Sequence, residues 1–500
     1  MYFKNRPDRQ AWALVAAFIG LQALIKALLP DGLDLDSSEQ AYFAQRLLMG
    51  YGTRQPPLYT WVLWVAEHGP LPMQSLLEAM RFAVIAAWFL AVGWVVRLCT
   101  PSRTALAVAL LAHMSLGFVM WRVFDSLTHT MLAVLLVTLA CGALLRWWQS
   151  ASLGWAVAAG VLGGLACLAK FNAGLWWGCA LASAWLLPEM RARMLQRRSL
   201  LQWAAALAAF GMVLLPYALW WLSQHLAASG LASQIVVPRA GQSFFKPALD
   251  MLAGVGEYLA LGVWVLLLTA VAGRRDGAPR VDRGVLADWR WRWMALQSVL
   301  VLAVTGALLL ATHASAFKGR WLWPVAPLLP FAVLWPVLAR PALPRRMVVA
   351  TVALGVIAMG VVSLRFFEPR VRAPKCENCW SLRPAGEMAK ALQARYGDGT
   401  LYLTGEKHLA GMLIAEGLPA YVVEIVRLPP PDLRPQRCVV VWANNGRGAE
   451  LDKPPAGFLG VAPAAATAPP LGRWPMPHAP GRAFTLRASE QPCPPAVAQP

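Results

Sequence analysis

The sequence contains few charged residues, only 14% of 500. Soluble domains average about 25%. Acidic residues are the scarcest, with 25 Asp and Glu against 45 Lys and Arg, so the formal net charge is +20. Hydrophobic residues make up 58% of the chain, and the mean hydropathy is +0.50. These proportions exclude an ordinary soluble globular domain and indicate an integral membrane protein.

Several motifs that would indicate other classes are also missing. The first apolar segment, residues 11–29, has no small-residue cleavage site, so we do not expect a cleavable signal peptide. The seven His and eight Cys residues show no convincing metal-ligand spacing, and we therefore predict no metal and no cofactor. No convincing internal repeat of the kind often seen in transporters is present.

Long apolar segments recur through the first 364 residues. Because a helix needs about 20 residues to cross a bilayer, they predict about eleven transmembrane helices. The segments are 11–29, 81–98, 104–121, 127–145, 152–169, 173–188, 200–222, 250–273, 294–312, 321–339 and 347–364. Only "AKFN" separates the pair within 152–188, which makes this the weakest division.

Lys and Arg are concentrated in the loops on one side of these segments. By the positive-inside rule this predicts a cytoplasmic N-terminus, and an odd number of helices then places the C-terminus outside. The same rule explains the net charge of +20 as membrane orientation, so nucleic acid is not expected as a partner.

The composition changes near residue 365, where Pro, Gly and charged residues increase. We divide the chain into a transmembrane domain, 1–364, with a structured first outer loop at 30–80, and an extracytoplasmic domain, 365–500. The runs "TLYLTG", "AYVVEIV" and "CVVVWA" predict strands, and "AGEMAKALQARYG" and "EKHLAGMLIAEG" predict helices. A small α/β domain is therefore expected, followed by a disordered Pro/Ala-rich end.

Four cysteines lie in this C-terminal domain: Cys376, Cys379, Cys438 and Cys493. An even number on the predicted outer face favours structural disulfides, with the pairing open. "CENC" alternatively fits a redox pair or half of a metal site, but the chain has no second CxxC.

The first outer loop opens with "DLDSSEQAYF", residues 34–43. Asp36 followed by Glu39 is the pattern of a capping box, in which Asp36 caps a helix and Glu39 reaches back to it. A carboxylate at the mouth of a membrane cavity is the alternative, and a cap would also hold such a carboxylate rigidly. An amphipathic loop helix, ended by "GYG", and a short interfacial stretch at 58–66 should follow.

Other polar residues fall on the same predicted side of the membrane. They are Asp125, Lys170, Asn172, Arg239, Lys318 and Arg320. A carboxylate among cations suits chemistry on an anionic, phosphate-bearing substrate that arrives from the bilayer. The simpler alternatives are that Asp125 caps a helix and that Lys318 and Arg320 extend toward the interface.

The order of these motifs resembles the family 39-type glycosyltransferases of the GT-C fold, relatives of protein O-mannosyltransferases and of the lipid A aminoarabinose transferase. The acidic motif after the first membrane helix, the loop helix and "PPLYTW" carry the resemblance. It extends to "FDSLTHTMLAVLLVTLACGALLRWW", "GGLACLAKFNAGLWW" and "FKGRWLWPVAP". Together these cover most of residues 10–340.

The resemblance implies transfer of a sugar from a polyprenyl-phosphate donor, at the outer face of a bacterial inner membrane. The family's catalytic base falls on Asp36, with Glu39 the nearest second acid, and Asp125 matches its second acidic position. Cations stabilising the leaving phosphate would be Lys318, Arg320, Lys170 and Arg239. This chain has Gln55 where many members have Lys before Pro-Pro, which shifts one phosphate contact to Arg54.

The resemblance leaves the sugar open, and the acceptor can be a lipid, a polysaccharide or a protein. A transporter or lipid flippase is the main alternative, although the charges lie at loop ends rather than at mid-membrane depth. An inactive scaffold whose C-terminal domain recruits an envelope partner is a third possibility.

Overall fold

The structure is a computed structural model, and the chain divides into two compact units. The helical unit consists of Met1–Gln22, Thr53–Leu58 and Phe82–Val362, and the α/β unit of Ala23–Gly52, Tyr59–Arg81 and Ser363–Pro500. The described residues are 6–29, 32–52, 55–124, 126, 128–226, 245–272, 287–312, 314, 317–338, 345–373, 380–422, 437–443 and 469–493.

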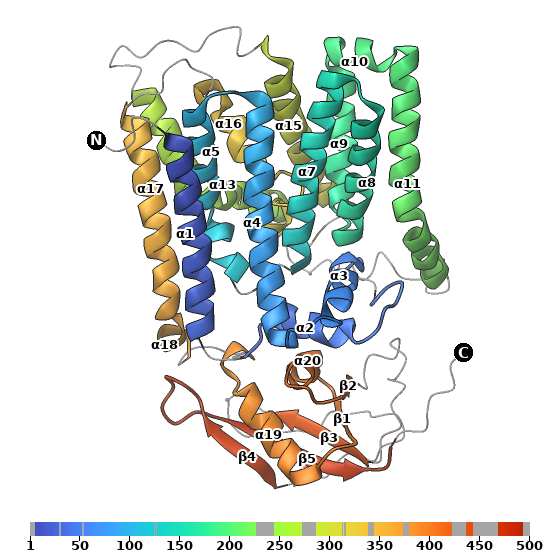
Figure 1. The fold of residues 1–500 in the computed structure, drawn as a ribbon, viewed down its shortest axis with the longest axis vertical. Coiled ribbons are helices and arrows are strands. Elements are labelled where there is room, and N and C mark those ends of the chain that lie inside the picture. The colour runs from blue at the N-terminus through green and yellow to red at the C-terminus, as the bar shows by residue number, and fades with distance from the viewer. Residues whose placement is uncertain are drawn as a thin grey trace. The chain divides into compact units, whose positions relative to one another are not determined.

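The helical unit is a bundle of apolar helices, in which α7, α8, α9 and α11 lie side by side (Figure 1). The helices are α1 Pro7–Leu28, α4 Met73–Cys99, α5 Arg103–Met114, α6 Gly117–Met120, α7 Thr128–Ser150, α8 Leu153–Ala169, α9 Ala173–Leu186, α10 Pro188–Met194, α11 Arg197–Leu226, α13 Lys246–Ala272, α15 Trp289–Ala311, α16 Leu329–Leu338 and α17 Arg345–Ser363. Short 3-10 helices lie at η2 Arg122–Phe124 and η4 Gly319–Trp321. Helices α1 and α4 continue into the α/β unit.

Six helices among the described residues are long and apolar enough to cross a membrane. They are Pro7–Leu28, Met73–Cys99, Thr128–Ser150, Arg197–Ser223, Trp289–Ala311 and Val349–Phe366. Shorter apolar helices occur at Arg103–Met114, Leu153–Ala169 and Ala173–Leu186. Each of the eleven predicted segments coincides with at least one helix, and the count of eleven spans stays a prediction.

Two predicted segments are interrupted. Segment 104–121 divides into α5 and α6 at Ser115 and Leu116. In segment 321–339 the helix begins only at Leu329, because Pro324 and Pro327 lack the backbone N–H that a helix interior requires. By contrast, the weakest division holds, since residues 152–188 form separate helices α8 and α9.

The α/β unit contains a five-stranded sheet in the order β2-β1-β3-β5-β4. Its elements are α2 Leu35–Ala44, α3 Leu58–Glu67, η5 Leu364–Phe366, α18 Glu368–Arg372, η6 Trp380–Leu382, α19 Ala385–Tyr396, β1 Thr400–Thr404, α20 Lys407–Ala415, β2 Ala420–Val422, β3 Arg437–Ala443, β4 Pro470–Pro475 and β5 Ala483–Gln491. Strand β1 pairs in parallel with β2 and β3, whereas β5 runs antiparallel to β3 and β4. Helix α19 covers one face of the sheet (Figure 1).

The first outer loop shares its hydrophobic core with this sheet. Tyr42 and Phe43 of α2 are buried in one cluster with Tyr402 of β1 and Leu409 of α20. Most of loop 30–80 therefore belongs to the α/β unit, whereas the sequence suggested the N-terminal domain. The loop helix also begins and ends earlier than the amphipathic pattern indicated, since α2 stops at Ala44.

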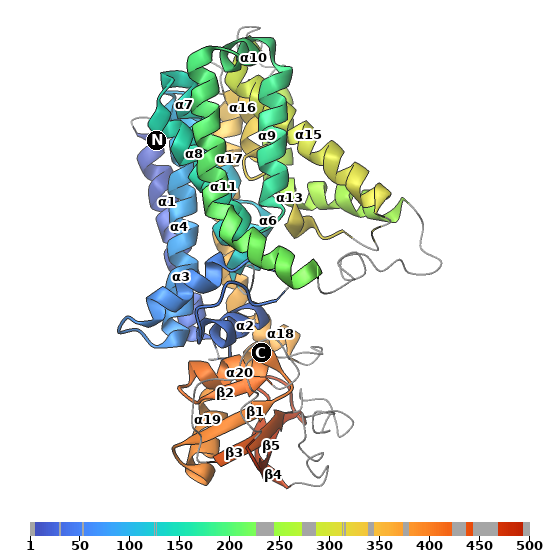
Figure 2. The same cartoon turned by 90° about the vertical axis from the view of Figure 1, so that its right-hand side faces the viewer.

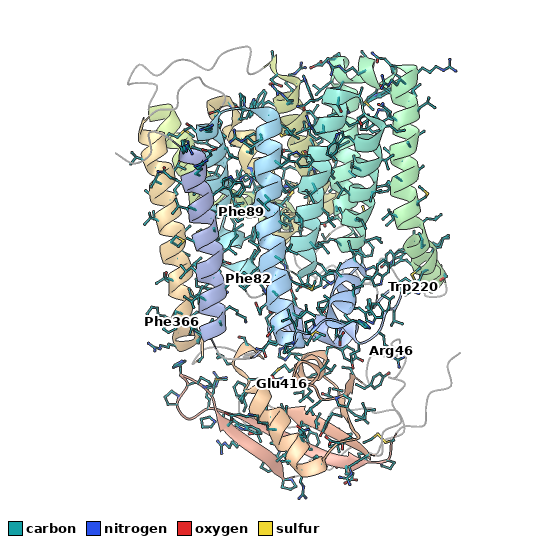
Figure 3. All side chains as sticks on the ribbon, viewed as in Figure 1. Arg46, Phe82, Phe89, Trp220, Phe366 and Glu416 are labelled. Carbon is teal, nitrogen blue, oxygen red and sulfur yellow. A yellow bond between two sulfur atoms is a disulfide. The ribbon has the colours of Figure 1, made fainter. Side chains whose placement is uncertain are left out.

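The expectation of a disordered C-terminal end is wrong for Pro470–Pro475 and Ala483–Gln491, which form β4 and β5. Residues Phe484 and Leu486 of β5 are fully buried, so burial against the rest of the sheet outweighs the local Pro/Ala-rich composition. A disulfide joins Cys438 to Cys493, visible as a yellow bond in Figure 3. This confirms a structural disulfide, while Cys376 and Cys379 lie outside the described residues.

Candidate active site

Helix α2 begins at a different residue from the one expected. Its N-cap is Asp34, whose carboxylate accepts a hydrogen bond from the Ser37 amide at 3.0 Å. The Ser37 hydroxyl donates to the same carboxylate at 2.6 Å. The prediction of Asp36 as the cap was therefore wrong, because an N-cap keeps extended backbone and Asp34, with ψ 168°, is the last such residue.

Asp36 lies in the first turn of α2 and is half-buried. An anion is favoured there, because the unpaired N–H groups of a helix N-terminus carry partial positive charge. The sequence assigned Asp36 both the helix cap and the candidate catalytic carboxylate. In the structure Asp34 is the cap, so only the second role is left for Asp36. Asp36 stays the candidate base.

A buried ion pair adjoins the cap. Arg81 of α4 donates through Nη2 to Asp34 Oδ2 at 2.8 Å and to the Ser37 hydroxyl at 2.7 Å. The side chains of Arg81 and Asp34 are 4% and 8% exposed. Arg81 Nε lies 3.4 Å from Glu78 Oε2, and Glu78 Oε1 lies 3.7 Å from Lys26 of α1. The helix N-terminus is therefore anchored by a network of charges that the sequence did not reveal.

Glu39, the second predicted acid, is one turn further along α2. Its Oε1 accepts from Lys407 of α20 at 2.6 Å, and the Lys407 ammonium lies 5.5 Å from the centre of the Phe43 ring. Glu39 thus does not reach back to cap its own helix.

Helix α20 packs backbone to backbone against α2. A Cβ on Gly411 would lie 1.8 Å from the Ser38 carbonyl oxygen, so only glycine fits there. His408 Nε2 lies 3.1 Å from the carbonyl oxygen of Leu33, just before the cap, and Val422 N donates to the Tyr42 hydroxyl at 3.2 Å. Figure 2 shows α2 and α20 side by side. The C-terminal residues thereby hold the helix that carries Asp36.

Tyr59, from the "PPLYTW" motif, is buried in the same neighbourhood. Burial raises the pKa of its hydroxyl, the Arg81 charge lowers it, and Asp34, Glu78 and Asp36 raise it further. These charges therefore surround one phenol at the start of α3. Beside it, Thr60 donates to Gln40 Oε1 at 2.7 Å, which ties α3 to α2.

Lys170 lies in the turn between α8 and α9 of the helical unit. Its Nζ donates to the Thr130 hydroxyl at 2.6 Å. Asn172, in the same turn, donates from its amide to the Trp321 carbonyl of η4 at 2.9 Å. This hydrogen bond joins the Lys170 turn to the segment that carries Lys318 and Arg320.

Lys318 and Arg320 flank Gly319 at the start of η4, and Lys318 is exposed. A Cβ on Gly319 would meet Glu257 Oε2 at 3.0 Å, Gly254 Cα at 3.2 Å and Phe118 at 3.4 Å. Three segments, α6, α13 and η4, approach closely at this glycine. Its small size brings two cations next to α13.

Glu257 of α13 was not among the residues expected from the sequence. Its carboxylate is exposed beside the Lys318–Arg320 segment, and it forms no ion pair with any other described residue. After the Lys246–Asp250 pair in its first turns, Glu257 is the one other charged residue in the sequence of this 27-residue helix, and an ionisable residue within an apolar helix is costly and often functional. Glu257 lies inside the predicted segment 250–273, and no motif distinguished it from other residues of that segment.

Asp125, Arg54 and Arg239 lie outside the described residues. Asp36 and Glu39 belong to the α/β unit, whereas Lys170, Lys318 and Arg320 belong to the helical unit. The roles of all eight residues stay predictions.

Two curated proteins are similar to this chain in sequence. No family model matches it. It is 27% identical to the lipopolysaccharide core galacturonosyltransferase RgtA of Rhizobium johnstonii over 370 residues, 70% of this chain and 71% of RgtA. It is also 27% identical to RgtB of that bacterium over 340 residues, 65% of each protein.

Solved structures show the same fold. ArnT from Cupriavidus metallidurans bound to undecaprenyl phosphate aligns with a TM-score of 0.57 and 14% identity, covering 94% of this chain and 97% of ArnT. The apo form aligns with a TM-score of 0.58 and 15% identity, covering 95% and 98%.

The fold is therefore the GT-C fold, with apolar helices and a small C-terminal sheet domain. With the two curated relatives, it confirms the resemblance found in the sequence: the chain is a multi-pass membrane glycosyltransferase. Neither the transporter nor the scaffold alternative finds support in these relatives.

Proposed function

We propose that this enzyme transfers a galacturonosyl residue from a polyprenyl-phosphate donor to a lipopolysaccharide acceptor at the periplasmic face of a bacterial inner membrane. The N-terminus is then cytoplasmic and the C-terminal domain periplasmic. The 27% identity to RgtA over 71% of its length is the observation that favours this sugar and acceptor. The ArnT fold, solved with undecaprenyl phosphate, supports the lipid-linked donor.

In this mechanism the Asp36 carboxylate removes the proton from an acceptor hydroxyl as its oxygen attacks the anomeric carbon. The bond between that carbon and the phosphate oxygen breaks, and the lipid phosphate departs with the electron pair. Lys170, Lys318 and Arg320 stabilise the charge that develops on the phosphate, with Arg239 and Arg54 as further proposed contacts. Proposed roles for Glu39 and Asp125 are to assist or orient the acceptor.

The first test is turnover by purified protein. Polyprenyl-phosphate galacturonate and polyprenyl-phosphate aminoarabinose serve as donors, and lipid A, lipopolysaccharide core and a protein as acceptors. We expect transfer of galacturonate to the core. Turnover with aminoarabinose alone, or only with a protein acceptor, would contradict the proposed substrates.

The base is tested by Asp36→Asn at matched folded yield. Loss of a general base lowers the rate by roughly 10²- to 10⁴-fold. Glu39→Gln and Glu257→Gln are measured beside it, and Glu490→Gln, on the exposed end of β5, is the control. If Asp36→Asn turns over normally and Glu257→Gln does not, the base is Glu257.

The phosphate contacts are tested by Lys318→Met, Arg320→Gln and Lys170→Met. Each should raise the donor KM or lower kcat, because a cation on the leaving group is lost. Lys246→Met is the control, since Lys246 is exposed and paired with Asp250. If all three variants keep the wild-type kcat and donor KM, these three cations do not bind the phosphate.

A further inference from the structure

Arg81 links the N-cap of α2 to the third turn of α4 through contacts that are almost completely buried. One nitrogen, Nη2, donates to both Asp34 Oδ2 and the Ser37 hydroxyl, at 2.8 and 2.7 Å. Asp34 meanwhile accepts from the Ser37 amide. The three side chains therefore close a small polar network around the first turn of α2, the turn that carries Asp36.

Burying two charges has a large desolvation cost, and apolar residues of similar volume often stabilise a protein equally well. Directional hydrogen bonds do allow one arrangement of the groups and exclude others. Here the two hydrogen bonds from Arg81 Nη2 go to Asp34 and Ser37, one on each side of Asp36 along the chain. What the network specifies is thus the orientation of this one helical turn.

We propose that Arg81 is a positioning residue for catalysis, which acts through Asp34 and Ser37 to hold Asp36 in its reactive orientation. This inference rests on the proposed function of Asp36 as the base. A lysine would not replace it, because the planar guanidinium places Nη2 on Asp34 and Ser37 while its Nε lies 3.4 Å from Glu78 Oε2. A lysine ammonium is a single point charge on a flexible stem.

The test is Arg81→Lys, which keeps the charge but loses the fixed geometry. At matched folded fraction, kcat should fall roughly ten- to a hundredfold, the range expected when a reacting group is misplaced by about 1 Å. The donor KM should stay within about twofold of wild type, because Arg81 is not proposed to touch the donor. Ser37→Ala, a milder change that keeps the ion pair, should lower kcat in the same direction by less.

The combined variant with Asp36→Asn distinguishes positioning from general structural support. If Arg81 acts through Asp36, Arg81→Lys lowers the residual turnover of Asp36→Asn no further. If it merely supports the fold, the two losses multiply. Arg437→Lys, at the exposed pair with Glu490, is the matched control and should leave kcat unchanged.

This inference is overturned if Arg81→Lys and Ser37→Ala keep the wild-type kcat while Asp36→Asn is inactive. The proposed role of Asp36 as the base would then still stand. Losses that multiply, or that only follow a loss of folded protein, would overturn it as well. Wild-type turnover in Asp36→Asn would overturn both the base and the positioning role.

Discussion

At the scale of single residues, His408 is the clearest case of a side chain whose protonation is controlled by its surroundings. Burial, and then the charge of Arg383, hold the pKa of His408 well below its usual range. Because Nε2 faces the Leu33 carbonyl, that nitrogen carries the proton and Nδ1 faces Arg383 at 3.4 Å. The folded protein therefore keeps this histidine neutral.

We predict that this histidine destabilises the folded α/β unit in acid. As pH falls below about 6.5, the unfolded chain binds a proton that the folded chain does not, so stability falls by up to about 1.4 kcal/mol per pH unit. Above that pH the contribution is constant. The measurement is the unfolding temperature at pH 7.5, 6.5 and 5.5 for wild type and His408→Gln.

The stability advantage of wild type over His408→Gln should shrink as the pH is lowered. His478→Asn, at an exposed histidine on the β4–β5 turn, is the control and should parallel wild type throughout. A difference between wild type and His408→Gln that stays constant across the three pH values would show that His408 does not titrate in this way.

At the scale of elements, the contact between α2 and α20 decides where Asp36 lies. The Ser38 carbonyl occupies the space that a side chain on residue 411 would need. The contact therefore joins the backbone of α2 to the backbone of α20. Backbone atoms do not move aside as a flexible side chain does. The two helices therefore separate if residue 411 gains even a methyl group.

Gly411→Ala should destabilise the protein by about 1–3 kcal/mol, the usual range for an overpacked contact, and should lower turnover because α2 shifts. Gly386→Ala is the matched control. The Cβ there would meet only the end of the Glu416 side chain, at 3.3 Å, which can rotate away. Thermal unfolding and turnover of both variants check this. Equal effects at the two glycines would mean that the α2–α20 contact is not tight.

At the scale of the whole molecule, the C-terminal residues are part of the unit that carries the candidate base. Tyr42 and Phe43 share a core with the sheet, and Lys407 and His408 contact α2 and the residue before its cap. A domain that only selected acceptors could be removed without losing chemistry. This one also supplies the packing surface of α2.

Deleting residues 380–500 should therefore abolish transfer to every acceptor, rather than change which acceptor is used. The measurement is turnover with each acceptor in turn, together with the amount of protein that stays folded in detergent. Deleting only 494–500, beyond Cys493, is the control. A truncated enzyme that still transfers the sugar, but to another acceptor, would favour the selection role instead.

Local patterns were sufficient for much of this protein. Apolar segments long enough to span a bilayer coincide with helices, since in lipid the backbone can satisfy its own hydrogen bonds in that way. The strands β1, β2 and β3 and the helices α19 and α20 follow from short-range periodicity alone. The motifs "DLDSSEQAYF" and "FKGRWLWPVAP" likewise indicated the glycosyltransferase class before any contact was known.

Other features depended on partners distant in the chain. Asp34 rather than Asp36 caps α2, and its partner Arg81 is 47 residues away. Glu39 pairs with Lys407 across 368 residues, and β5 is a strand because β3 and β4 lie beside it. Sequence periodicity reports which face of an element is apolar, but not which element will cover it. Which carboxylate caps the helix and which pairs with a cation was therefore decided only by the tertiary structure.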